Sequence, residues 1–158
     1  DPFEHIDNLE ETLDIAYSCL QPGGALVAFF SEIWSSPGGH LGTTIPDKIK
    51  QMYGHHTHLS LNINTMADAL TKMCNYSQKD AIKTANYIFK EEGINRLLME
   101  DYLEIFRDSR FKIKNIIPEN SIDFNQYYPN NPGIVKLITD NHPKARSSCH
   151  GFTIHLVK

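Results

Sequence analysis

The turn Pro22-Gly23-Gly24 and the apolar run Ala25-Leu26-Val27-Ala28-Phe29-Phe30 that follows it decide the fold class of this chain. Proline and glycine end the segment before them. A short run without a polar residue is typical of a strand that is covered on both faces, as in the parallel sheets of α/β proteins. The stretch therefore predicts an α/β fold with residues 25–30 as a central, parallel-type strand.

The segments on either side of this strand extend the prediction. Upstream, Asp7 and Glu10 have the spacing of a capping box, and apolar residues recur at helical intervals, which predicts a helix over residues 7–19. Downstream, residues 31–46 are rich in Ser, Gly and Pro and predict a long loop. In open α/β sheets ligands bind at the carboxyl ends of strands, so we expect the functional site in this loop.

The rest of the chain predicts a helical middle and a strand pair near the end. Helices are expected over residues 48–53, 65–75, 78–92, 99–108 and 132–139, and strands over residues 111–117 and 151–157. We therefore divide the chain into a core helix, strand and active-site loop (1–46), a helical insertion (47–98), and a C-terminal helix with the strand pair (99–158).

The composition is that of an ordinary globular protein. Hydrophobic residues make up 41% and charged residues 22% of the 158 residues. The longest apolar run is too short to span a bilayer, and a net charge of -4 without a basic patch gives no general attraction to nucleic acid. Cys19, Cys74 and Cys149 have no CxxC spacing. We expect a cytoplasmic protein with no membrane and no nucleic-acid partner.

Several motifs resemble class I S-adenosylmethionine (SAM) methyltransferases. Phe3-Glu4-His5-Ile6-Asp7, then a helix, then Leu20-Gln21-Pro22-Gly23-Gly24-Ala25-Leu26-Val27 are similar in order and spacing to the EHI-D and L-x-PGG-x-L stretch of that family. The similarity continues at Ile33-Trp34-Ser35-Ser36, Gly39-His40 and Asn95-Arg96-Leu97. The resemblance implies the C-terminal portion of a Rossmann-like methyltransferase domain, with a mixed sheet whose last strand is antiparallel and residues 47–98 as a lid.

The resemblance also implies a function, which is SAM-dependent methyl transfer to an O or N atom of a small-molecule or sugar-like acceptor. It places Asp1, Pro2, Phe3 and His5 beside the methionine end of SAM. The family's glycine-rich cofactor loop has no counterpart here, so most SAM contacts would come from a missing N-terminal segment. The alternative from a different class is a non-catalytic interaction module or degenerate half-domain.

His40 is the candidate catalytic base. It lies in the glycine-rich loop after the strand, where an imidazole can take a proton from a hydroxyl or an amine as the methyl group is transferred. Glu32 is a second, weaker candidate for the same role. Asn95 and Arg96 precede a predicted helix, and we expect them to brace the site.

A metal site is a further alternative. Asp1, Glu4 and His5 are spaced i, i+3 and i+4, which places them on one face of a helix that begins early. The pattern resembles the E-x-x-E-H metal motif of small-RNA 3'-terminal 2'-O-methyltransferases, with His40 as a possible fourth ligand. Oxygen and imidazole ligands suit magnesium, manganese or zinc, which would make the chain part of a metal-assisted enzyme.

Three further histidines, His55, His56 and His58, lie within four residues of one another. Their spacing matches neither the HExxH motif nor a zinc finger, so we expect them to lie in a solvated loop and bind no metal. Trp34 and Tyr53 are expected to pack in the core more than to wall a substrate pocket.

Overall fold

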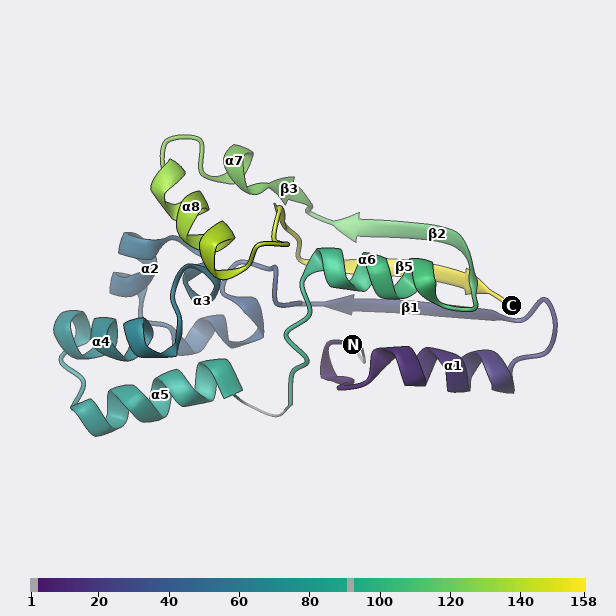
Figure 1. The fold of residues 1–158 in the computed structure, drawn as a ribbon, viewed down its shortest axis with the longest axis horizontal. Helices are drawn as coiled ribbons and strands as arrows, with labels where there is room; N and C mark the ends of the chain where they lie inside the picture. The colour runs from purple at the N-terminus through teal and green to yellow at the C-terminus, as the bar shows by residue number, and fades with distance from the viewer. Residues whose placement is uncertain (1–2, 91–92) are drawn as a thin grey trace.

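The chain folds into two lobes, one built on a sheet and one helical (Figure 1). The computed structural model describes residues 3–90 and 93–158. The architecture is mixed α/β, as expected from the sequence. Within the described residues no helix is both long enough and apolar enough to cross a membrane.

The sheet has three strands, and the last strand of the chain lies in its middle. In spatial order the strands are β1 (Ala25–Ser31), β5 (Gly151–Val157) and β2 (Lys112–Glu119). The central β5 is antiparallel to both neighbours, which confirms an antiparallel last strand. The predictions of a mixed sheet and of a parallel-type β1 are wrong for the described residues, because both strand pairings there are antiparallel. It approaches β1 closely at Gly151, where an added Cβ would lie 2.1 Å from the carbonyl oxygen of Phe30.

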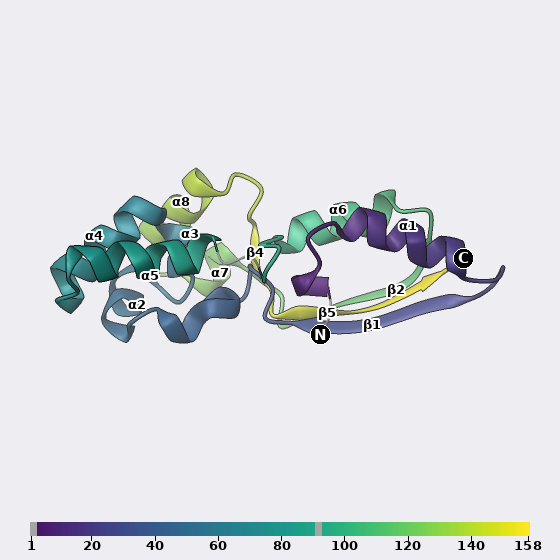
Figure 2. The ribbon, with the colours of Figure 1, turned by 90° about the horizontal axis from the view of Figure 1, so that it is seen from below.

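The prediction that β1 is central and covered on both faces is wrong for the described part of the chain. Helices α1 (Leu9–Cys19) and α6 (Met99–Asp108) lie on the same side of the sheet (Figure 2). On the opposite face the side chains of Val27, Phe29 and Ile117 are 65%, 50% and 50% exposed. An apolar run allows a strand to be buried on both faces, but other segments must pack against each face. In the described part of the chain, helices pack against only one face of the sheet.

The covered face of the sheet is filled by aromatic rings. Phe30 of β1 lies 5.0 Å from Tyr102 of α6 and 5.3 Å from Phe3, measured between ring centroids. Phe3 belongs to the short 3-10 helix η1 (Phe3–His5), so this packing fixes the position of η1 beside the end of β1. Aromatic pairs at such distances contribute about 1 kcal/mol beyond the apolar area that they bury.

Helix α1 begins one residue later than the predicted capping box. Asn8 is the N-cap, and its side-chain oxygen accepts a hydrogen bond from the backbone N–H of Glu11. The Asn8 amide also donates to the Glu11 carboxylate at 2.9 Å. The pairing of Asp7 with Glu10 is therefore wrong, because an asparagine one residue further on takes the same capping role.

The helical lobe has one core to which distant segments contribute. Its helices are α2 (Asp47–Tyr53), α3 (Thr57–Ser60), α4 (Ile63–Cys74), α5 (Gln78–Lys90), α7 (Phe124–Tyr127) and α8 (Pro132–Asn141). Phe124 and Ile138 are buried in the same core as Trp34, Leu59 and Met66. The helical lobe thus draws on α7 and α8 as well as on the predicted insertion, residues 47–98.

Short elements join the two lobes. The 3-10 helix η2 (Gly39–Thr44) lies in the loop after β1, and the two-residue strands β3 (Ile122–Asp123) and β4 (Ser147–Ser148) pair with each other. The loop predicted for residues 31–46 is therefore partly ordered as helical turns, and it runs from the sheet into the helical lobe.

Candidate functional site

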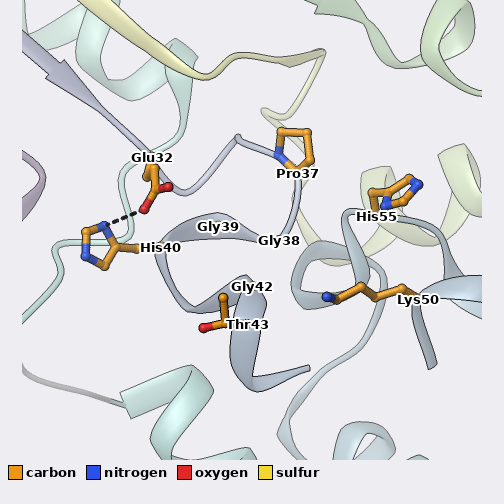
Figure 3. A pocket seen from close by; sticks show the side chains of 9 residues that line it. All are labelled: Glu32, Pro37, Gly38, Gly39, His40, Gly42, Thr43, Lys50 and His55. Carbon is orange, nitrogen blue, oxygen red and sulfur yellow. Dashed lines mark ion pairs between the residues drawn. The ribbon is translucent and has the colours of Figure 1, made fainter. Parts of the chain in front are cut away.

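The loop after β1 holds a pocket of about 220 Å³ (Figure 3). It lies at the carboxyl end of the strand, where the sequence predicts a functional site. The lining residues are Glu32, Pro37, Gly38, Gly39, His40, Gly42, Thr43, Lys50 and His55. Because most of these side chains are polar or charged, the pocket suits a small polar ligand.

The two candidate catalytic residues lie together at one side of this pocket. Glu32 Oε2 is 4.0 Å from His40 Nδ1, while Lys50 and His55 lie on the other side (Figure 3). Glu32 follows β1 directly and has a left-handed backbone with φ of 57°. For a residue with a Cβ, this left-handed conformation is less favourable than the right-handed one by roughly 1–2 kcal/mol. Residues in such conformations concentrate at functional sites.

Gly39 sets the position of the neighbouring His40. It has a φ of 56°, and an added Cβ would lie 3.0 Å from ring atoms of both Trp34 and His58. The loop therefore lies directly against two buried rings. A glycine is needed at this point because of the positive φ and because a side chain would meet these rings.

The N-terminal helix η1 brings two further predicted residues to His40. The rings of His5 and His40 meet edge to face with centroids 4.8 Å apart, and Glu4 Oε1 is 3.8 Å from His5 Nε2. Glu4, His5 and His40 place one possible ligand atom each within 4.8 Å of one another. The structure thus brings together three of the four metal candidates, and the fourth, Asp1, lies outside the described residues.

The remaining cofactor candidates have different surroundings. Phe3 is buried in the aromatic core of the sheet lobe, with its ring against Phe30. His5 is exposed and faces His40. Pro2 lies outside the described residues, as Asp1 does.

Asn95 braces this arrangement, as predicted. Its side-chain amide donates to the carbonyl oxygens of Phe3 at 2.6 Å and Ile6 at 3.0 Å, and its backbone N–H donates to the carbonyl of Glu4. Its side-chain oxygen accepts from the Tyr102 hydroxyl at 3.0 Å. Asn95 therefore clamps η1 to α6. Arg96 lies with its guanidinium 5.2 Å from the centre of the Trp34 ring.

Two of the three clustered histidines are buried, which contradicts the prediction of a solvated loop. His58 is fully buried, and its Nε2–H donates to the carbonyl oxygen of Trp34 at 2.7 Å. Burial lowers the pKa of His58 to about 4. Its ring lies edge-on to Trp34 with centroids 4.6 Å apart, so His58 packs against the loop that carries Trp34. Trp34 lies in the core, as predicted.

His56 is the centre of a second buried network. The Tyr128 hydroxyl accepts the backbone N–H of His56 and lies 2.8 Å from Nδ1, and Nε2 lies 3.0 Å from Ser148 Oγ. This pattern fits a neutral imidazole that accepts at Nδ1 and donates at Nε2. Burial, followed by the charges of His58 and His55, lowers the pKa of His56 to about 3. No pattern in the sequence predicts this network.

No family model matches the chain, and neither a curated protein nor a solved structure is significantly similar to it.

Proposed function

We propose that this chain is the acceptor-binding part of a SAM-dependent methyltransferase that acts on an O or N atom of a small-molecule or sugar-like acceptor. The observation that carries the proposal is the meeting of His40 and Glu32 beside a polar pocket at the carboxyl end of β1. The residues of this loop are also those that resemble the methyltransferase family.

The chemistry requires little of the protein beyond alignment and one proton acceptor. The acceptor oxygen or nitrogen attacks the methyl carbon, the carbon–sulfur bond breaks with its electron pair going to sulfur, and the acceptor's proton is lost. His40 would take that proton, and Glu32 would stabilise the imidazolium that forms. Holding donor and acceptor in line supplies most of the rate enhancement.

The pocket suits such an acceptor in size and polarity. Thr43 offers a hydroxyl, and Lys50 and His55 offer nitrogen donors opposite His40 (Figure 3). These groups can hydrogen-bond to the hydroxyls of a sugar-like molecule. The helical lobe, which supplies Lys50 and His55, would act as the lid that selects the acceptor.

The SAM-binding part would come from a further segment of the protein. The chain has no glycine-rich loop of the kind that binds SAM. In the described part, β1 is an edge strand, and its bare face exposes Val27 and Phe29. An edge and an apolar face of this kind can take further strands and a further layer.

The test is SAM binding and methyl transfer by the protein that contains residues 1–158 together with its SAM-binding part. His40→Ala should lower turnover by about 100-fold or more while the affinity for SAM stays the same. His155→Ala is the matched control, because His155 lies on the central strand away from the pocket. Equal turnover of His40→Ala and the parent would exclude the role of His40.

A non-catalytic interaction module is the second candidate, and the same exposed edge and apolar face of β1 favour it. Calorimetric titration with SAM separates the two. Absence of SAM binding by the whole protein would exclude the methyltransferase and leave the interaction module.

A further inference from the structure

Glu4, His5 and His40 form a cluster of three possible metal ligands. One carboxylate and two imidazoles converge from η1 and from the loop after β1, with ligand atoms within 4.8 Å of one another. We propose that these three residues bind a divalent transition-metal ion such as zinc, manganese, iron or cobalt. This inference rests on the cluster itself and does not depend on methyl transfer.

The hydrogen bonding of His5 leaves a lone pair that faces the cluster. His5 Nδ1 lies 2.5 Å from the carbonyl oxygen of Gly93, which can only accept, so Nδ1 carries a proton. In the neutral ring Nε2 is then an acceptor, and it lies 3.8 Å from Glu4 Oε1, which is also an acceptor. Metal-binding histidines are usually oriented in this way, with the other ring N–H held by a backbone carbonyl.

Glu4 provides a second, independent observation. Its side chain is 1% exposed, and its Oε2 is buried without a hydrogen-bond partner among residues 3–90 and 93–158. A buried charged oxygen without a partner is strongly unfavourable, and a cation beside it removes the penalty. The backbone carbonyl of Glu4 accepts a hydrogen bond from the N–H of Asn95 at 2.9 Å, which holds the residue at a fixed point of the fold, and its Oε1 lies 3.8 Å from His5 Nε2.

The donor set selects the class of ion. Two imidazoles and one carboxylate are the ligands of catalytic zinc sites and of non-haem iron sites, both of which keep open positions. Ligand atoms around such an ion lie about 3.4 Å apart, so the present spacing needs side-chain shifts of about 1 Å. His5 and His40 are partly exposed, and His40 also lines the pocket, so the open positions would face water or a pocket ligand.

The test measures metal binding to the full chain. After treatment with a chelator and dialysis, the protein is titrated with zinc by calorimetry and with cobalt by visible absorption. We expect one ion per chain and the d–d absorption of bound cobalt. Glu4→Gln keeps the shape of the side chain but removes its charge, and it should weaken binding at least about 10-fold, as should His40→Ala. Glu10→Gln and His155→Ala, which change an exposed acid and a histidine away from the cluster, should bind like the parent.

A second measurement does not depend on the folding of any variant. X-ray absorption of the zinc-loaded parent protein should give a shell of nitrogen and oxygen at about 2.0–2.1 Å with the scattering of two imidazoles. The proposal is overturned by absence of stoichiometric binding, by binding that both cluster variants retain, or by a shell with no imidazole. A His5 ring that carries protons on both nitrogens in the presence of saturating zinc, as read by nitrogen NMR, would also overturn it.

Discussion

Two buried imidazoles, His56 and His58, should strongly destabilise this protein on mild acidification. Both have no exposed surface, and the contacts of His56 with the hydroxyls of Tyr128 and Ser148 fit a neutral ring. Protonation would place a positive charge in the core of the helical lobe, beside Trp34 and Phe124. The unfolded chain binds these protons freely, so acid favours it.

The size of the effect follows from the pKa values. In the unfolded chain a histidine has a pKa near 6.5, whereas burial lowers the pKa of His56 to about 3 and that of His58 to about 4. Above pH 6.5 neither group changes stability with pH. Below pH 6.5, each histidine lowers the free energy of unfolding by about 1.4 kcal/mol per pH unit until the pH reaches its pKa in the folded protein. At pH 5 the pair together removes about 4 kcal/mol, a large share of the ~5–15 kcal/mol that stabilises an ordinary domain.

The assay is urea unfolding followed by circular dichroism at a series of pH values from 8 to 4.5. The two histidines should contribute a slope approaching about 2.7 kcal/mol per pH unit between pH 5.5 and 4.5. His58→Gln keeps an N–H that can reach the Trp34 carbonyl but does not titrate, so its slope should be smaller by about 1.4 kcal/mol per unit. Carboxylates titrate equally in both proteins and cancel in the comparison. Identical slopes in the parent and His58→Gln would refute the reasoning.

Two further predictions concern stability at neutral pH, measured by urea unfolding. Gly151→Ala should destabilise the protein by about 3 kcal/mol or more, because the new Cβ would meet backbone atoms of β1, whereas Gly133→Ala in α8 should be neutral or slightly stabilising; equal effects would mean that the two strands do not approach as described. Asn95→Ala should lower the free energy of unfolding by about 2 kcal/mol or more, since two carbonyls of the N-terminal segment lose their donor. Asn86→Ala in α5, which removes only a local bond to the Ile82 carbonyl, should change it little. A harmless Asn95→Ala would show that the N-terminal segment is not clamped there.

Much of the secondary structure could be predicted because its signals are local. The apolar runs and turn residues predicted β1 and β5, and helical periodicity predicted α4, α5 and α6 to within a few residues. The helices α3 and α7 are only four residues long, which is too short for any periodic signal, so the sequence predicts no helix at either place.

The surroundings of a residue could not be predicted in the same way, because they are set by distant parts of the chain. His56 is buried because Tyr128 and Ser148, far along the sequence, close over it. Val27 and Phe29 read as core residues but lie on the bare face of the sheet, since no described segment covers them. The cluster of Glu4, His5 and His40 was an open alternative in the sequence, and only the folded geometry brings its members together.

His40 has a different role as a catalytic base than as a metal ligand, and experiments on turnover can distinguish the two roles. A base must be free to take the acceptor's proton, whereas a metal ligand must keep its lone pair on the ion, which then itself acidifies the acceptor hydroxyl. If His40 acts as the base, turnover of the whole protein survives a chelator, and Glu4→Gln affects it little. If the ion activates the acceptor, the chelator and Glu4→Gln both abolish turnover, and added metal restores it only in the parent. Loss of turnover in His40→Ala alone supports the first mechanism, and parallel loss in Glu4→Gln supports the second, because Glu4 does not line the pocket and can reach the acceptor only through the cluster.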